Sequence, residues 1–199
     1  MPLALPHSRF VVAALTALAT CAAIAQSSRN VDPPAPPLPS EYTDEARRSY
    51  AQQLNEARVL LEAKRYDEAI TRLSAVSKER PREAQARFLM AVAQADSGRP
   101  QDAVATLRAL LSDFPELPEP RNNLAVLYAG QGNYPLARQE LELAIAAAPD
   151  YAIAHENLGD VYARLAVTQY ERAAALDKAN RTAAPKLKLA RELLATSTR

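Results

Sequence analysis

The sequence predicts an all-α fold, in which helical hairpins stack into a solenoid that ends in a capping helix. Two observations predict it. The composition favours helix and excludes an all-β protein, because Ala and Leu are abundant and only 4 of the 199 residues are Gly. Prolines also recur every 34 residues, at Pro81, Pro115 and Pro149, and a fixed period of this length is typical of stacked repeats.

Residues 1–25 predict export through a signal peptide. The stretch 11–25 has no charge, and at about 15 residues it is shorter than a membrane-spanning helix. Ala23-Ile24-Ala25 fits a small-x-small cleavage site. The expected location is the periplasm. The alternative is an outer-membrane lipoprotein, because Leu18 to Cys21 is similar to a lipobox in which Cys21 is lipidated, although Thr20 departs from that pattern.

Residues 26–40 predict a Pro-rich linker. Five prolines lie between residues 33 and 39, and proline is incompatible with a helix interior or a central strand. We expect an extended, semi-rigid spacer. The alternative is a docking motif for a Pro-binding domain.

Residues 41–181 predict the repeat domain, with repeats at 50–83, 84–117 and 118–151 and a degenerate fourth at 152–181. Each block reads as two helices and a turn. Gly98 and Gly132 lie where the first helix should end in a left-handed conformation. Small residues recur where helices would approach closely, and leucines recur one turn later; these are Ala69, Ala103 and Ala137, then Leu73, Leu107 and Leu141.

These residues resemble the tetratricopeptide repeat family. Leu124-Ala125-x-x-Tyr128 and Leu158-Gly159-x-x-Tyr162 are similar to its first-helix signature, and the Ala–Leu–Pro series is similar to its second-helix signature. The resemblance covers about residues 50 to 180 and implies a right-handed α-solenoid. The family's Trp is replaced in all four blocks, and in the fourth we expect His155 to pack between helices in its place.

The C-terminal part departs from the period. No Gly or Pro occurs between Asp160 and Ala184, so local signals allow one continuous helix from about Ile153 to Lys178. A tight turn near Val167 and Thr168 is the alternative. Residues 182–199 predict a capping helix and tail, with four residues facing inward: Leu187, Ala190, Leu193 and Leu194.

Charge and motifs exclude several functions. The chain has 24 Lys and Arg against 23 Asp and Glu, which argues against nucleic-acid binding. One Cys and two His exclude a disulfide framework and a Cys-rich metal site. Catalytic motifs such as G-x-S-x-G and H-E-x-x-H are absent. We therefore expect a protein that is not an enzyme, has no cofactor, and does not bind membranes unless Cys21 is lipidated.

The family resemblance implies that the first helices line a concave groove for a partner peptide. The candidate residues are Asn55, Arg58, Phe88, Asn122, Asn123, Asn157 and Arg164. Asn55, Asn123 and Asn157 share the sixth position of their blocks and could form an amide ladder along a peptide backbone. Phe88 would anchor an apolar side chain. The alternatives are a common polar position for the Asn residues and internal packing for Phe88. A carboxylate clamp is not expected, because Glu119 stands where a cation is needed.

The sequence thus predicts an interaction scaffold of the cell envelope that binds a protein or peptide. The alternatives are an assembly lipoprotein anchored at Cys21 and an accessory subunit of an envelope enzyme or secretion complex. Self-association through an uncapped end of the solenoid is a further expectation.

Overall fold

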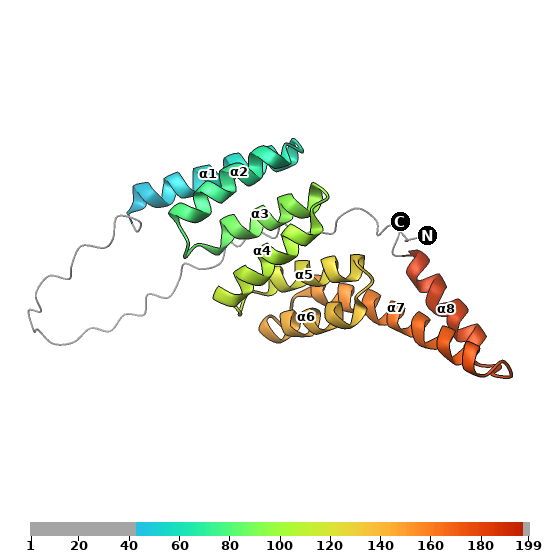
Figure 1. The fold of residues 1–199 in the computed structure, drawn as a ribbon. Coiled ribbons are helices and arrows are strands. Elements are labelled where there is room, and N and C mark those ends of the chain that lie inside the picture. Colours follow the sequence, from blue (N-terminus) through green and yellow to red (C-terminus); the bar gives the residue numbers. More distant parts are fainter. Residues whose placement is uncertain (1–42, 197–199) are drawn as a thin grey trace, which may run out of the picture.

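The structure, a computed structural model, describes residues 43–196, and these form eight helices in pairs along a solenoid (Figure 1). The helices are α1 (Asp44–Glu62), α2 (Tyr66–Glu79), α3 (Ala84–Asp96), α4 (Pro100–Asp113), α5 (Pro118–Gly130), α6 (Tyr134–Ala147), α7 (Ala152–Leu176) and α8 (Ala183–Thr196). The all-α solenoid fold is confirmed. The predicted signal peptide, Cys21 and the Pro-rich linker lie outside the described residues.

The three hairpin turns share one backbone geometry. Gly98 and Gly132 have φ of +78° and +76°, and Lys64 takes the same left-handed region with φ of 57°. The next residue then donates its N–H to a carbonyl five residues back, at 2.8 Å in all three turns. This is the C-terminal helix motif that the glycine positions predict. It reverses the chain in three residues and sets the second helix against the first.

The repeating small residues and leucines form the core. Ala69, Ala103 and Ala137 are 0% exposed, and the leucines one turn later are at most 1% exposed. One cluster of buried residues joins α1, α2 and the adjoining side of α3, and a larger one runs from α3 to α7. Each second helix packs on the following first helix, so consecutive pairs share their apolar surfaces.

The fourth position of three blocks holds a polar link that the sequence analysis missed. Arg87 and Arg121 donate to the carbonyls of Pro81 and Pro115 at 3.1 and 2.8 Å. His155 Nε2 lies 2.9 Å from the Pro149 carbonyl oxygen, and its side chain is exposed. The expected packing of His155 between helices is therefore wrong. A polar nitrogen thus stands where the family has Trp, and it binds a carbonyl of the loop that follows each second helix.

The last two helices leave the regular path. Val167 and Thr168 lie inside α7, so the continuous helix is correct and the tight turn is wrong. Of the predicted inward residues of α8, Leu187, Ala190 and Leu194 are half-buried, but Leu193 is 57% exposed. Leu193 points outward because α8 packs on α7 and on no other helix extensively, which covers one side of it only. In Figure 1 this hairpin projects from the end of the solenoid.

Candidate binding surface on the first helices

The predicted groove residues come from α1, α3, α5 and α7, and their exposure differs. Asn55 is exposed, and Arg58, Asn157 and Arg164 are half-buried. The other three candidates, Phe88, Asn122 and Asn123, are at most 1% exposed. Packing between first helices therefore uses part of the set that the sequence assigned to a partner.

Phe88 belongs to the core. It lies in the large cluster with Leu107 of α4 and Leu124 of α5. The prediction of an aromatic anchor is therefore wrong. The neighbouring pair of helices buries this ring, which leaves no surface for an incoming side chain.

The asparagines form a cluster between α5 and α7. Asn157 Nδ2 donates to Asn122 Oδ1 at 2.8 Å, and Asn122 Nδ2 donates to Asn123 Oδ1 at 3.4 Å. The buried Asn123 Nδ2 has no hydrogen-bond acceptor among the described residues. Asn55, on α1, has no bond to this cluster within the same residues. The sequence could have indicated that Asn122 and Asn157 are neighbours. They lie 35 residues apart, one more than the repeat of 34, so they occupy nearly equivalent positions on successive first helices.

Tyr151, before α7, and Glu119, in the first turn of α5, are half-buried residues on the elements that carry the cluster. Burial, followed by the negative charge of Glu119, raises the pKa of the Tyr151 hydroxyl to about 12. The Tyr151 hydroxyl and Glu119 Oε2 are buried and make no hydrogen bond within residues 43–196. The start of α5 and the start of α7 thus hold polar groups whose hydrogen-bonding capacity the fold does not fully use.

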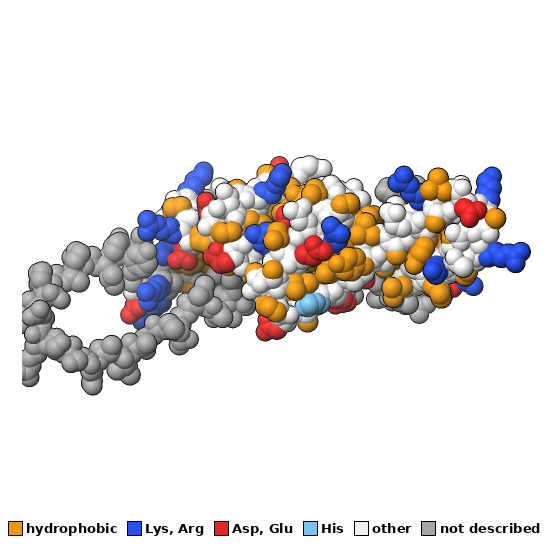
Figure 2. All heavy atoms as spheres, turned by 90° about the horizontal axis from the view of Figure 1, so that it is seen from below, with side chains coloured by type: hydrophobic (Ala, Val, Ile, Leu, Met, Phe, Trp, Pro, Cys, Tyr) orange, Lys and Arg blue, Asp and Glu red, His pale blue; other side chains and the backbone are white. Residues whose placement is uncertain are grey.

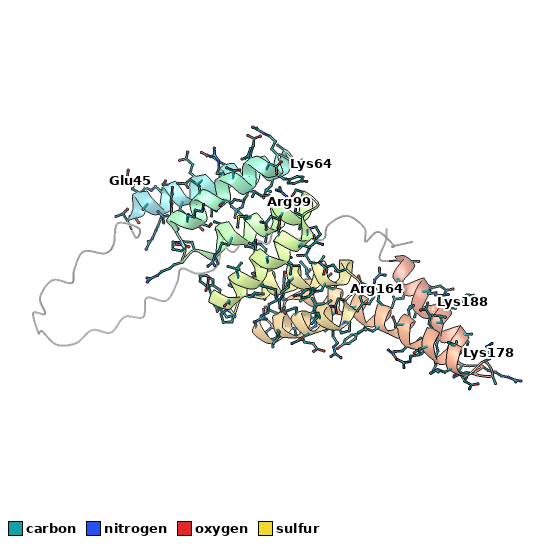
Figure 3. All side chains as sticks on the ribbon, viewed as in Figure 1. Glu45, Lys64, Arg99, Arg164, Lys178 and Lys188 are labelled. Atoms are coloured by element: carbon teal, nitrogen blue, oxygen red, sulfur yellow. The ribbon has the colours of Figure 1, made fainter. Side chains whose placement is uncertain are left out.

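The same face carries more acids than bases. Its cations are Arg58 and Arg164, and Arg164 lies over the Tyr134 ring at 5.7 Å where α7 leaves the repeats (Figure 3). The family resemblance implies that five acids of the same helices also face the groove, namely Glu62, Asp96, Glu119, Glu156 and Asp160. A field of this sign favours a basic ligand over an acidic one.

Family comparison identifies the repeats. A model described as tetratricopeptide repeat matches residues 54–118, and a second of the same description matches residues 94–158. Together they cover more than half of the 199 residues. The chain belongs to the tetratricopeptide repeat family. A comparison with curated proteins found no match.

Solved structures of tetratricopeptide repeat (TPR) domains share the fold. The first TPR domain of human RPAP3 has a TM-score of 0.56 at 13% identity, covering 60% of this chain and 94% of that one. The Sgt2 TPR domain from Aspergillus fumigatus has a TM-score of 0.58 at 16% identity, covering 64% and 83%. The Yersinia enterocolitica type III secretion chaperone SycD, solved with a YopD peptide, has a TM-score of 0.55 at 13% identity, covering 65% and 99%.

No group of three or more His, Cys, Asp or Glu within residues 43–196 could hold a metal ion. No helix in the same range is long and apolar enough to cross a bilayer.

Proposed function

We propose that this protein is a non-enzymatic scaffold that binds a segment of a partner protein across the first helices of its TPR domain. The amide cluster of Asn122, Asn123 and Asn157 carries the proposal. A buried amide donor without an acceptor costs about 1–3 kcal/mol, and a backbone carbonyl of a bound peptide would recover that energy at Asn123. Asn157, which donates to the neighbouring Asn122, is the half-buried member of the cluster.

The charge of the face restricts the partner. Five acids against two arginines favour a basic or neutral segment. A domain of similar fold, the first TPR of Spaghetti (RPAP3), was solved with the HSP90 peptide SRMEEVD, which is rich in acids. The partner proposed here has the opposite charge, in keeping with Glu119 where a carboxylate clamp would need a cation.

The test is crosslinking in native cells followed by affinity purification and mass spectrometry. The variant replaces two exposed first-helix acids, Glu62→Lys and Glu156→Lys. Its matched control makes the same charge change on exposed acids of second helices, Glu79→Lys and Asp102→Lys. We expect the first-helix variant to lose a partner that the wild type and the control retain. That partner also decides whether the scaffold serves an envelope enzyme, a secretion complex or neither.

Capture of the same partners by all three proteins would contradict the proposal. If both variants of equal helicity capture the same partners as the wild type, the first-helix face has a structural role only. The binding surface is then elsewhere on the molecule.

We also propose that the protein acts in the cell envelope, and the predicted signal peptide supports this location. The mass of the mature N-terminus decides how it is processed. A chain beginning at Gln26 indicates cleavage after Ala25 and a periplasmic protein. A chain beginning at a lipid-modified Cys21 indicates the alternative, an outer-membrane lipoprotein.

A further inference from the structure

Within residues 43–196, the C-terminal hairpin, formed by the distal half of α7 and by α8, has no covering helix of the kind that the other hairpins have. The second helices α2, α4 and α6 pack on the next first helices α3, α5 and α7. Among the described residues α8 packs extensively on α7 alone. Among the described residues, α8 is therefore the second helix of a pair on which no following first helix packs.

The face left bare on α8 is apolar. Leu189 and Leu193 lie one helical turn apart and are 65% and 57% exposed. Lys186 lies on the same side, with its ammonium 6.0 Å from the centre of the Tyr170 ring. At the end of α7, Leu176 is 79% exposed. We call Leu189, Leu193 and Lys186 the α8 stripe.

The hairpin is also basic, whereas the repeats are acidic. Residues 165–196 hold six cations against three acids; these are Arg172, Lys178, Arg181, Lys186, Lys188 and Arg191, and Glu171, Asp177 and Glu192. Residues 43–164 hold fifteen cations against eighteen acids. Figure 2 shows this excess of Lys and Arg at the α7–α8 end, where Figure 3 labels Lys178 and Lys188.

Two ion pairs use part of this charge. Arg191 lies 2.7 Å from Glu171, and Lys188 lies 3.8 Å from Glu192. Arg172, Lys178 and Arg181 make no ion pair with the described residues. Three cations of the hairpin therefore remain for an acidic ligand.

We propose that the α8 stripe docks an acidic amphipathic helix of a partner protein, which takes the place of the missing covering helix. The internal interfaces of the solenoid show that a helix fits such a hairpin, and the charge of the hairpin selects an acidic one. A second copy fits less well. Two of these hairpins repel each other, and the outward side of α1 is polar except for Val59, which is 56% exposed. This surface is separate from the first-helix face and does not depend on it.

The experiment titrates the full chain against two labelled synthetic helices and follows fluorescence anisotropy. Each peptide has about 18 residues with leucines three and four positions apart, and the remaining positions carry mostly Glu in one and mostly Lys in the other. We expect the Glu peptide to bind about tenfold more tightly or better. The double variant Leu189→Ser and Leu193→Ser should lose that binding. The control, Leu136→Ser and Leu143→Ser on α6, removes leucines that are 40% and 41% exposed and should keep it.

A charge variant keeps the proposal testable if the leucine variant fails to fold. Lys178→Glu and Arg181→Glu lie in the connection between α7 and α8 and should abolish the preference for the Glu peptide. Equal binding of both peptides overturns the proposal. Two other results also overturn it: stronger binding to vesicles of phosphatidylglycerol and phosphatidylcholine, which would indicate a membrane surface, and a stripe-dependent dimer in sedimentation, which would indicate a second copy.

Discussion

The repeats and the C-terminal hairpin are both made of amphipathic helices, yet they bury them to very different extents. In the repeats, α4 lies between its own first helix and the next one, and Leu107 is 1% exposed. In the hairpin, α8 packs extensively on α7 alone among the described helices, and Leu189 is 65% exposed. A helix pair cannot bury its own apolar surface, so burial depends on the third helix.

The largest difference between the two regions should be in the loss of stability when a leucine is shortened to alanine. Leu107→Ala should lower the free energy of unfolding by about 2–5 kcal/mol, because it opens a cavity in a filled core. Leu194→Ala, at a half-buried site of α8, should lower it by about 1 kcal/mol. Urea unfolding followed by circular dichroism measures both. Equal losses would show that α8 is packed as tightly as the repeats.

A break in α7 should uncouple the regions. Thr168→Pro removes a backbone hydrogen bond inside the helix and should cost about 3 kcal/mol. We expect faster amide hydrogen exchange from residues 169 to 196 and unchanged exchange in α3 to α6, with Thr168→Ala as the control. If exchange also rises in α5, the hairpin and the repeats unfold as one unit.

Removing an amide of the buried cluster should lower the stability more than removing an exposed amide. Asn157→Ala leaves the buried Asn122 Oδ1 without its donor at 2.8 Å and should cost about 1–3 kcal/mol. Asn55→Ala, on the exposed side of α1, should change stability by less than about 0.5 kcal/mol. Thermal unfolding of the two variants decides this, and similar melting temperatures would contradict a structural role for the cluster.

Substitutions in the turns of the repeats should change the stability by a smaller amount. Gly132→Ala places a side chain at φ +76° and should cost about 1 kcal/mol. At the matching turn Lys64 has φ 57°, and Lys64→Gly should change stability by less, with the opposite sign. Denaturant midpoints measure both changes. A loss at both turns would mean that chain entropy outweighs the backbone strain at Lys64.

The last effect appears only at alkaline pH. Burial is the main cause that raises the pKa of both Tyr50 and Tyr151 to about 12, from the ordinary tyrosine value of about 10. Their contribution to stability is therefore full below pH 10 and is lost as the pH rises toward 12. Tyr50→Phe with Tyr151→Phe should flatten this loss. An unchanged alkaline profile in the double variant would assign the loss to other groups.

The parts of the candidate site that the sequence predicted are those set by the repeat period. The first helices, their polar positions and the Asn residues follow from a spacing of 34. Phe88 and His155 were misassigned, because a residue's place in a repeat does not say whether the neighbouring pair covers it. The bond between Asn157 and Asn122 depends on how two helices sit against each other, and the period places it only to within one residue.

The sequence by itself determined the all-α class, the TPR hairpins and their turns, because helix propensity, glycine at left-handed positions and a fixed proline period are local signals. Only the tertiary structure decided that Phe88 is core, that three asparagines form one cluster, and that α8 exposes Leu189 and Leu193. Each of these depends on which helices become neighbours. Burial is a property of pairs of surfaces, whereas the periodicity of a chain describes one surface at a time.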